Sequence, residues 1–180
     1  LITEPATTWQ LAGDFPAGRP AWERAGAEFV ADVTPYEQRK LWVLNAGHTL
    51  LASLGRLRGH SSVADCMTDP VCTEALAALW DDAAPVLPFS AVDLDRVRAG
   101  VAARFANPRI RHELAQIARD AELKLRERVV PVIRERLHRG LSAGDGELRA
   151  IAAWIAVGDA GQDTLLGGDG ADVLYGGTGN

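Results

Sequence analysis

A lysine, an asparagine and a histidine interrupt an otherwise apolar stretch of this chain. Lys40, Asn45 and His48 lie in the run KLWVLNAGHTLLASL, residues 40–54. Placing such polar groups in apolar surroundings costs free energy unless they are paired or used. On a helix that turns by about 100° per residue, the three side chains fall within an arc of about 140°. The spacing therefore predicts that they converge on one pocket.

These three residue types together suit proton transfer at an oxygen atom. A lysine held in apolar surroundings has its charged form disfavoured, which lowers its pKa from about 10.4 towards the range useful for acid–base chemistry. An amide and an imidazole beside it would donate hydrogen bonds to the substrate oxygen. The alternative reading is structural: the lysine extends its amine to water and the histidine is a satisfied core residue.

The composition is that of one soluble globular domain, with 180 residues, 47% hydrophobic and 24% charged. A net charge of −5 argues against nucleic acid as a partner, and no apolar run is long enough to predict a membrane partner. The arginines between residues 126 and 139 alternate with glutamates, which indicates a salt-bridged exposed face. Cys66 and Cys72 match neither a zinc spacing nor a disulfide framework, and His60, His112 and His138 have no companions at metal-ligand spacing. A reducing compartment is expected.

The element that positions the three polar residues begins at a strong start signal. Thr34-Pro35-Tyr36-Glu37 predicts a capping box with proline at the first helical position. The helix is expected to run to residue 55–58, which sets Lys40 in its second turn. Residues 1–33 contain several prolines and glycines and predict a loop-rich leading segment.

The rest of the chain up to residue 157 is expected to be helical too. The apolar spacing predicts helices from residue 70 to about 85, over 93–105, from 108 through 137, and over 147–157. No segment before Gly158 predicts a β-sheet. The expected fold class is therefore mainly α, a multi-helix domain over residues 1–157.

Residues 158–180 change character and repeat glycine and aspartate with a period of nine. They resemble the RTX calcium-binding nonapeptide, with Asp163 and Asp172 at the aspartate position. The resemblance implies Ca²⁺ ligands at these two residues, in an incipient β-roll or a tail that is disordered without calcium. The alternative is a flexible Gly/Asp linker with no ligand.

Several motifs of residues 1–157 resemble, in order, the C-terminal helical domain of the long-chain mannitol dehydrogenase family. This family includes mannitol and arabinitol dehydrogenases and the fructuronate and tagaturonate reductases. The matching motifs are Thr3-Glu4-Pro5, Gly18-Arg19-Pro20, Pro35-Tyr36-Glu37, the run from Lys40 to Thr49, Leu54-Gly55, and Arg104-Phe105-Ala106-Asn107-Pro108 followed by Ile110.

The resemblance implies metal-independent hydride transfer between NAD(P) and a secondary alcohol or ketone. Lys40 would be the acid/base, Asn45 and His48 would hold and polarise the reacting oxygen, and Lys124 would face the substrate. The substrate is a polyol or a sugar acid such as a hexuronate, because Asp120-Ala121-Glu122 departs from the Asp-Gly-Ser of many polyol enzymes.

The resemblance also implies a partner that these residues do not contain. No G-x-G-x-x-G turn follows a strand here, so the Rossmann domain that binds NAD(P) is expected to be missing and the chain to be inactive alone. Cytoplasmic location is expected, although an RTX-like tail is typical of secreted proteins. The competing hypothesis is a non-enzymatic calcium-binding module with a passenger helical domain.

Overall fold

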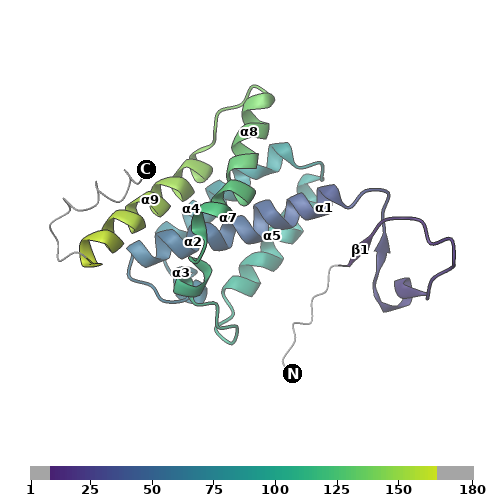
Figure 1. The fold of residues 1–180 in the computed structure, drawn as a ribbon, viewed down its shortest axis with the longest axis horizontal. Helices are drawn as coiled ribbons and strands as arrows, with labels where there is room; N and C mark the ends of the chain where they lie inside the picture. Colours follow the sequence, from purple (N-terminus) through teal and green to yellow (C-terminus); the bar gives the residue numbers. More distant parts are fainter. Residues whose placement is uncertain (1–8, 166–180) are drawn as a thin grey trace, which may run out of the picture.

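The fold was obtained as a computed structural model, which describes residues 9–165, with side chains for residues 9–158. Three helices form its centre (Figure 1): α2 (Ala46–Leu57), α4 (Pro70–Ala83) and α9 (Asp145–Leu165) pack against one another. The short helices α3 (Val63–Cys66) and α6 (Leu114–Ile117), and α7 (Ala121–Arg128), contact α2. Helix α8 (Val130–His138) contacts α4 and α9. The predicted mainly α class is confirmed.

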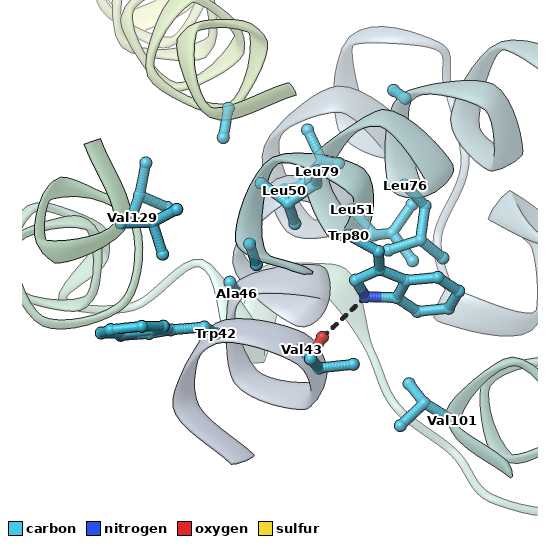
Figure 2. Packing of buried hydrophobic residues seen from close by; sticks show 14 of the residues in the cluster. Trp42, Val43, Ala46, Leu50, Leu51, Leu76, Leu79, Trp80, Val101 and Val129 are labelled. Atoms are coloured by element: carbon cyan, nitrogen blue, oxygen red, sulfur yellow. Dashed lines mark hydrogen bonds between the residues drawn. The ribbon is translucent and has the colours of Figure 1, made fainter. Parts of the chain in front are cut away.

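The core lies between α2 and α4 and is apolar on both sides. Leu50, Leu51, Leu76 and Leu79 are fully buried there. Figure 2 shows the one polar contact among the drawn residues: the indole Nε1 of Trp80 donates to the carbonyl oxygen of Val43 at 2.9 Å. This bond ties α4 to the stretch that carries the three polar residues.

The helix predicted from residue 34 forms, and it runs as α1 (Thr34–Arg39), the π-helix η2 (Lys40–Asn45) and then α2. Its end at Leu57 confirms the expected range. The capping box is wrong, because Thr34 is already the first helical residue and makes no side-chain cap. The carboxylate of Asp32 instead accepts from the backbone N–H of Thr34 at 2.9 Å.

The described part of the leading segment, residues 9–33, is loop-rich as predicted, with one small exception. Strands β1 (Gln10–Leu11) and β2 (Glu28–Phe29) pair in parallel, around the 3-10 turn η1 (Trp22–Ala25). The expectation of no sheet is wrong for these two pairs. Four aromatic rings hold the segment together, with the guanidinium of Arg19 at 3.5 Å from the ring centre of Phe29. The rings are those of Trp9, Phe15, Trp22 and Phe29.

Helix α4 and α5 (Ala91–Phe105) lie where they were expected, with a 3-10 turn, η3 (Ala84–Val86), between them. The single helix predicted from 108 through 137 is wrong. Residues 106–113 form a loop, and a break at Asp120, in the left-handed region with φ 54°, separates α6 from α7. Helix α9 begins two residues earlier than predicted and continues to Leu165. Within residues 9–165, no helix combines the length and the apolar content that a membrane span requires.

Candidate active site

A cavity of about 720 Å³ opens between the leading segment, α1, η2 and α5. Lys40 lines it, and so do charged residues of α1 and α5. The apolar part of its wall comes from Trp9, Val33, Leu44, Val97, Val101 and Ile110. The cavity therefore combines an amine with apolar surfaces, in a space large enough for a small molecule.

Lys40 lies at the mouth of this cavity, and its side chain is exposed. The prediction that it is held in apolar surroundings is wrong within the described residues. The apolar neighbours that suggested burial, Trp42 and Val43, face the core on the other side of the helix. Adjacent residues on a helix point in different directions, so apolar neighbours in sequence do not enclose a side chain.

The π-helix changes how the three polar residues are arranged. The N–H of Ala46 donates to the carbonyl of Leu41, five residues back, instead of the four of an α-helix. Such a wide turn brings residue 45 closer to the line of residue 40 than an α-helix does. The angle around the helix axis between Lys40 and Asn45 is therefore smaller than the value of about 140° estimated for an α-helix.

Asn45 and His48 are half-buried and lie deeper than Lys40, outside the residues that line the cavity. The imidazole Nε2 of His48 lies 3.4 Å from Nδ1 of His112, and its ring centre is 4.4 Å from that of Phe105. Burial, followed by the charges of His112, Arg104 and Arg128, lowers the pKa of His48 to about 3. His48 is therefore a neutral imidazole at physiological pH.

Arg128 fixes the backbone around Asn45. Its Nη1 donates to the hydroxyl of Thr49 at 3.1 Å and to the carbonyl oxygen of Asn45 at 3.4 Å. Burial lowers the pKa of this guanidinium, and no hydrogen-bond acceptor for its Nε lies among the described residues. Arg128 thus brings positive charge beside the polar residues of α2.

The cavity wall carries more positive than negative charge. Arg39, Arg96 and Arg104 line it together with Lys40, against the carboxylate of Glu37 in the lining and that of Asp93, which lies 3.3 Å from Arg96. The local field therefore favours an anionic group in the cavity.

Lys124 is not brought to this cavity. Its amine donates to the carbonyl oxygen of Ile117 at 2.9 Å and to that of Arg119, across the break between α6 and α7. These carbonyls end the short α6, so the lysine satisfies groups that the helix leaves open. Asp163 lies in the last turn of α9, but its side chain and the whole of Asp172 lie outside the described residues.

Sequence reasoning missed Arg104, His112 and Arg128. Arg128 was assigned to a salt-bridged exposed face, which holds for Arg126 with Glu122 but not for Arg128. The signal was its register: Arg128 follows Leu125, the buried residue of α7, by three positions, which places both on one side of the helix. His112 gave no local signal, since it lies in a loop 64 residues from His48.

Two families match this chain. The mannitol dehydrogenase C-terminal domain matches residues 32–163, and the RTX calcium-binding nonapeptide repeat matches residues 155–180. The oxidoreductase YeiQ of Escherichia coli is 42% identical over 168 residues, which cover 89% of this chain and 34% of that protein. The D-mannonate oxidoreductase of the same organism is 39% identical over 158 residues, covering 87% of this chain and 32% of that protein.

A solved structure supports the same relationship. The Pseudomonas fluorescens mannitol 2-dehydrogenase, in a ternary complex with NAD and D-mannitol, superimposes with a TM-score of 0.71 at 35% sequence identity. The match covers 81% of this chain and 30% of that one. The chain therefore spans about a third of the length of the relatives it matches.

Proposed function

Since this chain belongs to the mannitol dehydrogenase family and matches its C-terminal domain, we propose that it is the substrate-binding and proton-transfer part of an NAD(P)-dependent oxidoreductase. The cofactor, when bound, exchanges a hydride with the carbon of a secondary alcohol or ketone. No residue of this chain is proposed to hold it. Lys40 lines the cavity and is exposed, and we propose that a separate Rossmann domain presents the nicotinamide there.

In this proposal Lys40 holds the substrate oxygen and exchanges its proton. The supporting observation is that Lys40 lines a cavity of about 720 Å³ while the π-helix brings Asn45 towards the same face. The role proposed for His48, donation of a hydrogen bond to that oxygen from a neutral imidazole, rests on the family resemblance, because His48 does not itself line the cavity. Lys124 is left out, because its amine is bonded to backbone carbonyls.

We further propose that the substrate is a sugar acid. A neutral polyol has no use for the excess of cations that lines the cavity, whereas a carboxylate would bind to a guanidinium in two-pronged geometry. Arg104 of α5 lines the cavity together with Lys40 and is the residue proposed to take it, since Arg96 is paired with Asp93. The pair D-mannonate and D-mannitol tests this, because the two differ at one end by a carboxylate. The acid is expected to have the higher kcat/KM, and Arg104→Met is expected to reduce that preference.

The central experiment replaces Lys40 in the intact enzyme, this domain together with its NAD-binding domain. Lys40→Ala is expected to lower kcat by several orders of magnitude, since the substrate proton loses its acceptor. Arg126→Ala is the control, because Arg126 is an exposed cation paired only with Glu122 among the described residues. Equal activity of the Lys40→Ala variant and the wild type would overturn the proposal. The 180-residue chain alone is expected to show no turnover.

The second candidate function, calcium binding by the tail, is supported by the family match over residues 155–180. Asp163 and Asp172 are the proposed ligands. Calorimetry with Ca²⁺ on the wild type and on an Asp163→Asn/Asp172→Asn double variant tests it. Heat of binding that the double variant loses is the expected result, and no heat with the wild type would refute calcium binding.

A further inference from the structure

Three side chains of zinc-ligand type gather at the far end of α2, away from the cavity. They are His60, Asp69 and Cys72, and their donor atoms all lie within 4.8 Å of one another. Nε2 of His60 is 2.9 Å from Oδ2 of Asp69. Asp69 and Cys72 are buried, whereas the side chain of His60 is 23% exposed to solvent.

Backbone features at the end of α2 and at the start of α4 hold these side chains in place. Gly59, in the left-handed region with φ 82°, ends α2 and turns the chain so that the N–H of His60 donates to the carbonyl of Gly55 at 2.8 Å. Asp69 caps α4: its Oδ1 accepts from the N–H of Val71 at 2.9 Å. One carboxylate oxygen is thus fixed to the helix, and the other points to His60.

Cys72 lies in the first turn of α4 and Cys66 at the end of α3, and both are buried. Gly55 makes room for Cys66. A Cβ at that position would lie 2.3 Å from the sulfur of Cys66, which real contacts do not allow. The close approach of α2 and α3 therefore depends on this glycine.

We propose that His60, Asp69 and Cys72 form a zinc-binding site, with water in the fourth position. Thiolate, imidazole and carboxylate are the donors that Zn²⁺ takes in proteins, at about 2.0–2.3 Å. Around a tetrahedral ion such bonds place neighbouring donor atoms about 3.3–3.8 Å apart. To reach this geometry, the widest separation in the cluster has to shorten by about one ångström, and the His60–Asp69 contact of 2.9 Å has to lengthen slightly.

Zinc binding would change the protonation of Cys72, the tautomer of His60 and the hydrogen bond that Asp69 makes. The thiol of Cys72 releases a proton to solvent, and His60 takes the tautomer that frees the lone pair of Nε2. The guanidinium of Arg58, which is bonded to Oδ2 of Asp69, competes for that oxygen. His60 also lines a hollow of about 670 Å³ on the surface, which provides a route for the ion and the fourth ligand.

Cobalt is the probe for this site, because Co²⁺ bound to a thiolate has a charge-transfer absorption that oxygen and nitrogen ligands do not produce. The chain contains two cysteines, so this band reports on Cys66 and Cys72 alone. We expect one Co²⁺ per chain, displaced by one Zn²⁺. Cys72→Ser should abolish the band, and His60→Asn should weaken binding by a factor of 10 or more.

Matched variants separate the site from general damage to the fold. Cys66→Ser and His138→Asn are expected to keep the band, since neither residue is a proposed ligand. Arg58→Gln is expected to tighten binding, because it removes the competing cation. The proposal is overturned by the absence of a band with the folded wild type, or by a band that survives Cys72→Ser and disappears with Cys66→Ser. Neither result bears on the proposed oxidoreductase function, whose residues lie at the other end of the α1–α2 helix.

Discussion

Glu147 is the most deeply buried acidic residue in the described part of the chain. It is fully buried in the first turn of α9, and neither of its carboxyl oxygens has a hydrogen-bond partner among the described residues. Burial and the neighbouring Asp82 raise the pKa of Glu147 from 4.5 to about 9, against the opposing charge of Arg136. Arg136 is already committed to Asp82, with Nη2 at 3.4 Å from Oδ1. One guanidinium cannot neutralise both carboxyl groups, so Glu147 is protonated in the folded protein at neutral pH.

This shift predicts a pH-dependent loss of stability. Between pH 4.5 and pH 9 the folded protein holds a proton on Glu147 that the unfolded chain has released, so stability falls as the pH rises. The loss is about 1.4 kcal/mol per pH unit, which amounts to about 3 kcal/mol at pH 7 and about 6 kcal/mol above pH 9. Below pH 4.5 the carboxyl is protonated in both states and the loss vanishes.

Glu147→Gln removes the titration and keeps the size of the side chain. The amide brings an unpaired N–H at a cost of about 1–3 kcal/mol, but this cost does not change with pH. The test is therefore the slope. The free energy of unfolding of the variant minus that of the wild type should rise by about 1.4 kcal/mol per unit across pH 5.5–8.5.

Urea unfolding followed by the fluorescence of the five tryptophans measures both proteins at each pH. His48 contributes a slope of opposite sign below pH 6.5, because its pKa is lowered to about 3, but this contribution is common to both proteins and cancels in the difference. Glu74→Gln, on the exposed face of α4, is the control for the loss of one carboxylate. A flat difference for Glu147→Gln would refute the reasoning, since it would mean that Glu147 ionises as readily in the folded protein as in the unfolded chain.

Three further outcomes are expected. His112→Asn should raise the pKa of His48, because a positive neighbour that opposes its protonation is removed; NMR titration of the His48 ring measures this, and an unchanged pKa would contradict it. Gly146→Ala should destabilise the fold by about 3 kcal/mol, since the added Cβ would lie 2.2 Å from a backbone nitrogen of α4, whereas Gly100→Ala, with open space around it, should stabilise α5 by about 0.5–1 kcal/mol; equal thermal shifts would refute the contrast. Trp80→Phe should cost about 1–3 kcal/mol in urea unfolding, because a carbonyl of the π-helix loses its indole donor; no loss would mean that water replaces the indole.

The sequence predicted helix boundaries well where residues next to the boundary, such as a proline or a capping side chain, determine it. Proline in the first turn marks both α1 and α4, and Asp69 caps the second of them. The break at Asp120 could not be predicted in this way. A left-handed residue other than glycine is held by its surroundings, and here Lys124 binds the carbonyls on the near side of the break. The left-handed conformation at Asp120 is therefore determined by contacts between neighbouring turns and not by the helix propensity of the local sequence.

The depth of a charged side chain was the least predictable property. Lys40 in its apolar run and Glu147 between Gly146 and Leu148 give no sequence signal that distinguishes them, yet the first is exposed and the second has no exposed surface. The difference arises from what packs on each face. Helix α9 lies against α2 and α4, so a first-turn residue on its inner side is enclosed by two helices. Lys40 faces a cavity instead.

In the proposed reaction, the exposed Lys40 and the half-buried His48 have different tasks. A base that takes a proton from the substrate must pass it on to solvent, and an exposed amine at the mouth of the cavity does so directly. A group that polarises the oxygen must hold one protonation state and one orientation throughout the cycle. The burial of His48 against Phe105 and His112 supplies both.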